Sequence, residues 1–459
     1  MLDLSKLTAI NPVDGRYEDQ TTELRGICSE FGLMQRRVRV ELAWFKKLSE
    51  CEHVSEFPPF SAETQKALDR IEATFSHYDA ENIKSIERKI NHDVKAIEYF
   101  LKSKIENINE LGPHTEFVHF SCTSEDINNL AYALMLKDAA QTVLIPKMED
   151  IIGLLKRSVR AYAEKAMISR THGQPASPTT MGKELANYAA RLTRQLDSLK
   201  KIEYLGKFNG AVGNYNALSF AYPNADWIRI SEEFVHGLGL SWNEYTTQIE
   251  PHDYLAEFFE NLSRFNNVLS DLAKNLWSYI SIGYFSQKVN EGEVGSSTMP
   301  HKVNPIDFEN AEGNLGLSNS ISNYFADKLP KSRFQRDLSD STVLRNIGLP
   351  LAYSVIAYNS FIKGLPKLEL NENALKQDLE SNWEILAEAI QTVMRKHGIS
   401  EPYEKLKSLT RGRNLTETTI KEVIKKLDLP PLLETQLLDL RPESYTGEAS
   451  KLVERLLKK

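Results

Sequence analysis

The sequence predicts an all-α fold built around long helices. Only 22 glycines and 18 prolines occur among 459 residues, about 9% against about 12% in ordinary chains, so few elements should be interrupted. The segment Asp253–Ile282 has 30 residues without either, enough for a helix of about 45 Å. Apolar residues recur along it at alternating intervals of four and three, the pattern of a helix packed lengthwise against another. These residues are Phe258, Leu262, Phe265, Leu269, Leu272, Leu276 and Tyr279.

The predicted elements fall into three parts along the chain. Residues 1–113 mix short helices with turns such as Asn11–Gly15, and are expected to form an N-terminal domain. Residues 114–366 hold the long helices and are expected to form a central bundle domain. Residues 367–459 are again helical, with breaks at glycines and prolines, and are expected to form a C-terminal domain. Long, nearly parallel helices of this kind pack as an extended bundle.

Three segments inside the central domain can be predicted in more detail. A second apolar seam runs through Leu185–Leu199, and a third helix is expected over residues 136–166. Pro146 should kink or break that third helix, because proline removes a backbone donor. Residues 207–222 hold two glycines and several asparagines, so a short hairpin or an irregular loop is expected there.

Charge and cysteine content exclude several classes of protein. The formal net charge is −7, which argues against a nucleic-acid partner. Three sparse cysteines, Cys28, Cys51 and Cys122, indicate free thiols in a reducing compartment. Residues 1–10 lack the pattern of a signal peptide, and no segment has the roughly 18 apolar residues that a membrane helix requires. The sequence therefore predicts a cytoplasmic protein.

The segment Ser169–Ala176 is rich in polar side chains, which a simple connection between two bundle helices would not require. Gly173 and Pro175 predict a non-helical backbone, which would hold His172 on a rigid connection. A histidine held in this way can act as an acid or a base near neutral pH. The alternative is a capping loop whose histidine binds only backbone groups.

The segment Glu291–Pro305 follows directly on the longest predicted helix. Two glycines allow movement, and three consecutive hydroxyl residues, 296–298, supply donors for a developing anion. Lys302 adds a positive charge. The alternative is a flexible linker. A linker would also contain glycines, but it would not require the specific sequence Met-Pro-His-Lys-Val-Asn-Pro that ends the segment.

Two further segments carry groups that attract anions. Phe120–Asn129 has hydroxyls followed by two acidic residues, which is typical of a helix N-terminus. Arg336–Arg345 offers two arginines and hydroxyls that could hold a phosphate. Helix capping in the first and surface ion pairs in the second are the alternatives.

Several common motifs are absent from the sequence. There is no phosphate loop, no G-x-G-x-x-G, no His-Glu-x-x-His, no paired Cys-x-x-Cys and no Gly-x-Ser-x-Gly. A dinucleotide fold, a metal site and a serine hydrolase of the nucleophile-elbow type are therefore not expected.

The string Gly295–Pro305, with its eleven residues GSSTMPHKVNP, resembles the signature of the fumarase/aspartase superfamily. Its Met-Pro-His-Lys portion is similar to that of adenylosuccinate lyases. The similarity covers nearly the whole chain and is strongest to the bacterial form. Four further motifs and the Asp14–Tyr17 start agree with it, namely Asn91–Asp93, Thr123–Asp126, Arg170–Pro175 and Arg336–Arg345.

This resemblance implies a three-part fumarase/aspartase-like fold whose long helices form the core of a homotetramer, with active sites shared between subunits. It also implies a nucleotide substrate, adenylosuccinate or the ribotide SAICAR, cleaved to fumarate and AMP or AICAR. No cofactor and no metal is expected, and no nucleic acid or membrane is expected as a partner. Another lyase of the superfamily, such as argininosuccinate lyase, and a non-catalytic helical scaffold are the alternatives.

Elimination of this kind requires a base, an acid for the leaving nitrogen, and donors for a carboxylate that gains charge. The resemblance assigns the base to Ser296 and the acid to His172, and Lys302 with nearby amides is expected to stabilise the serine oxyanion. A substrate charge of about −4 would be matched by four cationic side chains. The residues expected to contact substrate are Arg16, Tyr17, Arg336, Ser341, Thr342, Val343, Leu344 and Arg345 at the phosphate, Thr123, Ser124, Gln248, Ser297 and Lys302 at the carboxylates, and Asn91, His92, Asp93 and Asn310 elsewhere.

Overall fold

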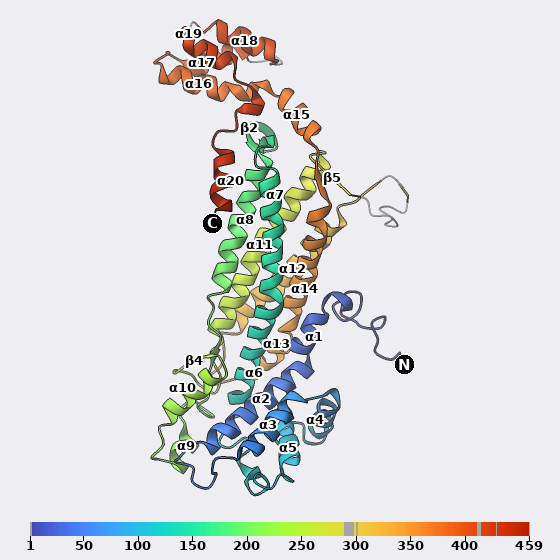
Figure 1. The fold of residues 1–459 in the computed structure, drawn as a ribbon, viewed down its shortest axis with the longest axis vertical. Coiled ribbons are helices and arrows are strands. Elements are labelled where there is room, and N and C mark those ends of the chain that lie inside the picture. Colours follow the sequence, from blue (N-terminus) through green and yellow to red (C-terminus); the bar gives the residue numbers. More distant parts are fainter. Residues whose placement is uncertain (1, 289–297, 300–301, 411–414, 428, 459) are drawn as a thin grey trace. The chain divides into compact units, whose positions relative to one another are not determined.

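A computed structural model describes residues 2–288, 298–299, 302–410, 415–427 and 429–458 of the chain. Most of these residues lie in α-helices, and within the described ranges strands occur only as three two-stranded pairs. The predicted all-α class is therefore confirmed, and Figure 1 shows the order of the elements.

The helices and strands have the following bounds. The α-helices are α1 (Thr22–Cys28), α2 (Glu30–Ser49), α3 (Ala62–Ala73), α4 (His77–Ile90), α5 (Asp93–Ile105), α6 (Ser124–Ala139), α7 (Ile145–Ala161), α8 (Met181–Leu199), α9 (Asn216–Ala221), α10 (Trp227–Gly237), α11 (Asp253–Ser281), α12 (Ile306–Lys328), α13 (Ser339–Leu344), α14 (Gly348–Gly364), α15 (Glu372–Glu380), α16 (Ala387–Lys396), α17 (Pro402–Thr410), α18 (Glu417–Lys425), α19 (Pro431–Leu438) and α20 (Ala449–Leu457). The strands are β1 (Ala166–Thr171), β2 (Gln174–Thr180), β3 (Leu205–Gly206), β4 (Ser241–Trp242), β5 (Phe285–Gln287) and β6 (Leu368–Leu370).

The chain forms two compact units, and each is assembled from segments that are distant in sequence. The division between them falls inside the long helices α7, α8, α11, α12 and α14. The three continuous domains expected from the sequence remain a prediction. Unit 1 consists of Met1–Met148, Gln195–Asn267 and Gly313–Asn359, and unit 2 consists of Glu149–Arg194, Val268–Glu312 and Ser360–Lys459.

Helix α2 is the centre of the N-terminal part of unit 1. It begins where the Ser29 hydroxyl accepts a hydrogen bond from the Gly32 amide, which satisfies one of the free donors of its first turn. Its buried face, which includes Val38 and Phe45, packs against α6. Helix α6 is buried on nearly every side, and α2 covers part of it and helps to fix the position of its first turn.

The helix predicted over residues 136–166 differs from the prediction at both ends. Helix α6 already begins at Ser124, and α7 ends at Ala161, before the first strand. Between them, Ala140–Leu144 form a π-type turn that leads into α7 just before Pro146. A proline lacks the backbone donor of a regular helix, and the wider turn accommodates this, so the predicted irregularity is confirmed as a local bulge and not a break.

Helix α11 has the length and the buried seam that its apolar repeat predicts. Phe258, Leu262 and Leu269 are fully buried. In unit 1, α11 is joined to α12 and α14 by a buried polar cluster around Asn266. The seam therefore faces other long helices, and residues of α11, α12 and α14 share one interior.

Residues 166–180 form an antiparallel hairpin of β1 and β2 in unit 2, where the sequence predicted only a non-helical connection. The two residues of its tip, His172 and Gly173, both have positive φ, at 52° and 75°. Left-handed residues at both turn positions match the twist of a two-residue hairpin. Gly173 adopts this conformation without strain, and it places His172 at the tip.

Residues 207–222 form an irregular loop followed by helix α9, so the alternative of a short hairpin is wrong. Strand β3 pairs in parallel with β4, far along the chain. The loop is tied instead to the start of α6, because the Asp126 carboxylate accepts hydrogen bonds from the amides of Asn209 and Gly210. The buried Lys207 ammonium also lies 3.0 Å from that carboxylate.

The C-terminal helices of unit 2 have their own apolar core. Side chains from α15 to α19 gather around Trp383, Ile390 and Ile420, and Ile168 of strand β1 joins them. This contact attaches the hairpin of β1 and β2 to the C-terminal helices, and it anchors the strand that leads to His172.

Candidate active site

The predicted site residues are divided between the two units. Ser296 and Ser297 lie outside the described residues. In unit 2 the structure describes His172, Lys302 and Asn310. The remaining fourteen predicted residues belong to unit 1, namely Arg16, Tyr17, Asn91, His92, Asp93, Thr123, Ser124, Gln248, Arg336, Ser341, Thr342, Val343, Leu344 and Arg345.

His172 is an exposed side chain at the tip of a well-anchored hairpin. The strand that leads to it is fixed by Arg170, whose guanidinium pairs with the Asp378 carboxylate of α15. The Tyr284 hydroxyl donates to the same carboxylate. The hairpin thus presents an imidazole from a rigid support, which is the arrangement that general acid–base chemistry needs.

Lys302 and Asn310 flank the start of helix α12. Lys302 is exposed, whereas Asn310 lies in the first turns of α12 and accepts a hydrogen bond from the Ser360 hydroxyl at 2.9 Å. The ammonium of Lys302 is therefore open to solvent, and the Asn310 side chain is held in one orientation.

The segment Asn91–Asp93 joins two helices of unit 1. Asn91 ends α4 in the left-handed conformation, with φ 56°. His92 begins α5 as its cap, because its Nδ1 accepts a hydrogen bond from the Lys95 amide at 3.1 Å. Asp93 follows as the first helical residue. Capping explains this sequence pattern locally, and the Asp93 carboxylate accepts a hydrogen bond from the Val94 amide at 2.9 Å.

The Asp93 carboxylate bridges two guanidinium groups. Its Oδ2 lies 2.8 Å from the buried Arg37 and 2.9 Å from Arg345. Burial alone would raise the pKa of Asp93, but Arg37, the Val94 amide and Arg345 outweigh it and lower the pKa to about 2. Asp93 is therefore an anion at neutral pH that holds Arg345 in place.

Arg336 is held by a second set of acceptors. Its guanidinium lies 2.9 Å from the Glu125 carboxylate and 3.7 Å from Asp340, and it donates to the Gln248 side chain at 3.3 Å. Gln248 in turn donates to the Ala211 carbonyl at 3.1 Å. The structure thus brings together Arg336 and Gln248, which the sequence had assigned to different parts of a substrate.

One buried chain of contacts connects the two arginines. Arg37 donates to the Asn128 side chain at 2.8 Å, and Asn128 donates to Glu125 at 2.8 Å. Because Arg37 also binds the carboxylate beside Arg345, and Glu125 binds Arg336, both guanidinium groups belong to a single network in unit 1.

Sequence reasoning missed several members of this network. Arg37 sits in the run Gln35-Arg36-Arg37, which looks like an ordinary charged helix face, yet its side chain is only 2% exposed. Glu125 and Asn128 were part of the segment interpreted as a helix start. A buried arginine requires paired partners, but its burial cannot be read from its residue type.

Four further predicted phosphate contacts, residues 341–344, lie in helix α13. The Ser341 amide donates to the Asp340 carboxylate at 2.7 Å, whereas the side chains of Val343 and Leu344 are buried in the core. Those two residues can therefore meet a ligand only through their backbone. Arg16 lies in the N-terminal segment and is exposed.

Thr123 and Ser124 occupy the start of α6, where the Thr123 amide donates to the Asp126 carboxylate at 2.8 Å. Helix capping is thus present, as the alternative interpretation of this segment had it. A cavity of about 330 Å³ opens beside this turn in unit 1. Its walls are formed by residues 121–123 and by residues of the 210–218 loop.

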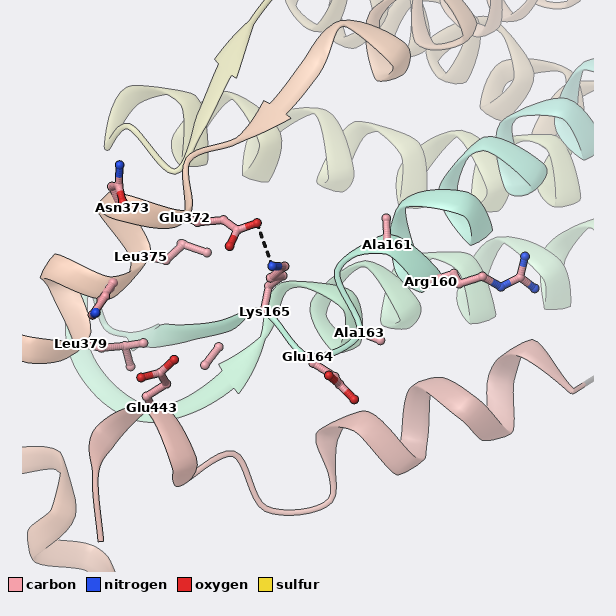
Figure 2. Close-up of a pocket in the computed structure, with 12 residues that line it drawn as sticks. Arg160, Ala161, Ala163, Glu164, Lys165, Glu372, Asn373, Leu375, Leu379 and Glu443 are labelled. Atoms are coloured by element: carbon pink, nitrogen blue, oxygen red, sulfur yellow. Dashed lines mark ion pairs between the residues drawn. The ribbon is translucent and has the colours of Figure 1, made fainter. Parts of the chain in front are cut away.

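A second cavity, of about 540 Å³, lies in unit 2 and contains none of the predicted site residues. Figure 2 shows Lys165 and Glu372 pointing toward each other at this cavity, where they form an ion pair at 2.7 Å. Its volume exceeds that of the cavity beside Thr123, but its lining has equal numbers of cationic and acidic side chains and so offers no excess of positive charge for an anion.

The described part of the chain offers neither a cluster of metal-binding side chains nor a membrane-spanning helix. No group of three histidine, cysteine or acidic side chains there could hold a metal ion. No helix there is long and apolar enough to span a bilayer. The three cysteines are all described, and their thiols are unpaired.

Comparison with known proteins gives the family. The family described as Lyase matches residues 15–317, and the one described as Adenylosuccinate lyase C-terminal matches residues 332–446. Among solved structures, a fumarate lyase from Mesorhizobium sp. BNC1 has a TM-score of 0.77 at 18% identity, covering 95% of this chain and 97% of its own. The 3-carboxy-cis,cis-muconate lactonizing enzyme from Pseudomonas putida has a TM-score of 0.73 at 22% identity, covering 95% and 96%. These two likenesses concern the fold, and they agree with the fumarase/aspartase-like fold expected from the signature string.

Full-length relatives are much more similar in sequence. The adenylosuccinate lyase of Haemophilus influenzae is 56% identical over 455 residues, which is 99% of this chain and 100% of the relative. The enzymes of the same name from Vibrio cholerae and Escherichia coli are each 54% identical, again over 99% of this chain and 100% of theirs. The chain therefore belongs to the adenylosuccinate lyase family of C–N lyases.

Proposed function

We propose that this protein removes fumarate from adenylosuccinate to give AMP, and from SAICAR to give AICAR, in purine biosynthesis. The observation that carries this proposal is the full-length identity of 54–56% to three enzymes named adenylosuccinate lyase. The signature string and the arginine network are consistent with it. Arginine forks recognise phosphate, and two of them are linked by one network in unit 1.

In the proposed mechanism, the Ser296 oxygen removes a proton from the carbon beside a succinyl carboxylate. The electrons move onto that carboxylate, and the C–N bond then breaks while His172 donates a proton to the leaving nitrogen. The backbone near Gly295 and the Lys302 ammonium would stabilise the serine oxyanion, because a neutral serine is a weak base. The position of His172 at an anchored hairpin tip supports its role as an acid.

The remaining predicted contacts complete the proposed substrate site. Arg16, Tyr17, Arg336 and the residues of 341–345 would hold the phosphate. Thr123, Ser124, Gln248, Ser297 and Lys302 would hold the carboxylates, while Asn91, His92 and Asn310 would line the rest. Asp93 receives a more specific role than the sequence allowed, because its carboxylate pairs with Arg345 and would orient that side chain toward the phosphate.

We further propose a homotetramer in which different subunits contribute to each active site, located in the cytoplasm. The basis is the resemblance of the motifs, together with the surplus apolar surface that long helices carry. On helices α11 and α12, for example, Trp277, Leu317 and Tyr324 are large apolar side chains that are about half exposed.

A comparison of substrates tests the proposed reaction. Purified protein is incubated separately with adenylosuccinate, SAICAR and argininosuccinate, and fumarate and the nucleotide products are quantified. We expect equimolar fumarate and AMP from the first, and fumarate and AICAR from the second. Fumarate from argininosuccinate alone would assign the protein to a different lyase, and the absence of product from all three would indicate a non-catalytic scaffold.

A further inference from the structure

His252 is a buried histidine that neither the sequence motifs nor the proposed mechanism uses. It lies immediately before helix α11, and only 2% of its surface is exposed. Its backbone has φ 67°, in the left-handed region that residues with a side chain adopt only under strain. Strained residues persist where the surrounding structure demands them, and they cluster at functional sites.

The imidazole of His252 lies between two buried carboxylates. Its Nδ1 is 3.6 Å from Glu250, and its Nε2 is 3.8 Å from Asp340. Among the described residues, neither ring nitrogen has a hydrogen-bond partner, and neither does Oδ2 of Asp340. These distances exceed a normal hydrogen bond, so His252 interacts with the Glu250 and Asp340 carboxylates through longer-range electrostatic attraction.

Asp340 connects His252 to the proposed phosphate site. One oxygen of Asp340 accepts the Ser341 amide at 2.7 Å and lies 3.7 Å from the Arg336 guanidinium. The other oxygen faces His252. Asp340 thus helps to orient Arg336, which is proposed to bind an anion, although the negative charge of Asp340 would itself repel that anion.

The charges around His252 show why a cation is needed there. Three carboxylates, those of Glu125, Glu250 and Asp340, are buried in this part of unit 1. Among the described residues, the cation that pairs with carboxylates of both α6 and α13 is Arg336. With a neutral His252, the three carboxylates would carry two more charges than Arg336 can offset. A charged imidazolium reduces this excess of negative charge to one.

We propose that His252 is a positioning residue that, as an imidazolium, offsets the charge of Asp340 and so allows Arg336 to bind a phosphate. This inference rests on the proposed function, because it takes the phosphate site from it. His252 does not touch the substrate, and it acts only through Asp340.

The ionisation of His252 agrees with this role. Burial alone would lower the pKa of His252, but the carboxylates of Asp340 and Glu250 outweigh it and, with Glu125, raise the pKa to about 9. The pKa of Asp340 is lowered, because His252 and Arg336 outweigh the effect of its burial. His252 is therefore charged at neutral pH, and it loses its proton as the pH rises through 9.

The test compares His252→Gln with His236→Gln, a control at an exposed histidine outside the network. Inhibition by inorganic phosphate is measured, together with kcat and KM for adenylosuccinate. We expect His252→Gln to weaken phosphate inhibition and raise KM by about tenfold, with a much smaller change in kcat, because one charge near the bound anion is lost. His236→Gln should behave as wild type. Phosphate inhibition that is equally strong in His252→Gln and wild type would overturn the proposal.

A pH series gives a readout that a purely structural role would not move. From about pH 8 to about pH 10, phosphate keeps its charge while His252 loses its own. Phosphate inhibition of the wild type should weaken over this range, and the slope should be clearly shallower in His252→Gln. Parallel slopes in the two proteins would contradict the proposal.

Two further variants keep the test decisive if His252→Gln folds poorly. The double variant His252→Gln/Asp340→Asn removes both charges, and it should bind phosphate better than His252→Gln alone. A double variant that is no better would overturn the charge argument. Arg336→Lys separates the two claims. If it also leaves phosphate inhibition unchanged, the proposed phosphate site itself is wrong, whereas a change in Arg336→Lys alone refutes only the role of His252.

Discussion

Arg336 and Arg345 are held differently, although both belong to one network. The Arg336 side chain is 15% exposed and is surrounded by acceptors, whereas that of Arg345 is 40% exposed. Asp93 anchors Arg345 on one side, and Glu30 lies 3.3 Å from it on another. Arg345 therefore has donors open to solvent that a phosphate can approach, and it is the better residue for a mutation that spares the fold.

Arg345→Ala should raise KM for adenylosuccinate by about 10- to 100-fold, because a charge-assisted contact to phosphate is lost. The matched control is Arg333→Ala, since the Arg333 side chain is 81% exposed and its ion pair is with Asp337, outside the arginine network. Steady-state kinetics of both variants check the expectation. An unchanged KM in Arg345→Ala would place the phosphate elsewhere.

The sequence could indicate which residues are candidates for binding a ligand, but not how their side chains are held. Arg336, Arg345 and Gln248 belong to motifs with polar residues in unusual places, so they could be singled out. Arg37 and His252 could not, because their importance comes from burial beside carboxylates that are distant in the chain. Residue type and local spacing contain no information on such long-range pairing.

At the scale of elements, the central helices combine an apolar seam with one polar cluster. Asn266 of α11 donates to the hydroxyls of Ser318 at 3.1 Å and Ser354 at 3.0 Å, and the Tyr358 hydroxyl donates to Asn266 at 2.6 Å. These hydrogen bonds fix the position of α12 and of α14 along α11 at Asn266. The apolar repeat predicted that these helices would pack, but their relative register depends on such polar contacts.

Asn266→Ala should destabilise the protein by about 2–4 kcal/mol, because it leaves buried hydroxyls without their partner. Asn267→Ala is the matched control, since Asn267 is the next residue and is exposed. Denaturant unfolding of both variants measures the difference. Equal stability of the two variants would show that the cluster contributes little.

The strands were the elements that the sequence could not predict. Strand β2 has two prolines and no alternation of apolar and polar residues, so nothing local marks it as a strand. It forms because the left-handed turn at His172 and Gly173 folds it back on β1, and because Ile168 packs among the C-terminal helices. Both causes are tertiary.

At the scale of the whole molecule, the two units are built from interleaved segments. The sequence predicts long helices from their apolar repeats, but local patterns do not reveal which distant segments pack into the same compact unit. Unit 1 contains the arginine network, and unit 2 contains His172. Under the proposed function, more than one subunit contributes to each active site.

Mixing of inactive variants tests the sharing of sites between subunits. His172→Ala and Ser296→Ala are each expected to be inactive alone. When they are unfolded together and refolded, some sites should contain an intact histidine and an intact serine from different chains, and part of the activity should return. A mixture that stays inactive despite subunit exchange confirmed by mass, or a monomeric protein, would show that each site is completed within one chain.

The central claim is that Ser296 starts the elimination of fumarate from a bound nucleotide, and fumarate release by Ser296→Ala tests it most directly. The rate is measured with saturating adenylosuccinate beside wild type and Ser320→Ala, a control at an exposed serine of α12. We predict a loss of about 10²- to 10⁴-fold in Ser296→Ala with AMP binding retained, and no loss in the control. Fumarate release by Ser296→Ala at a rate close to that of the wild type would contradict this account.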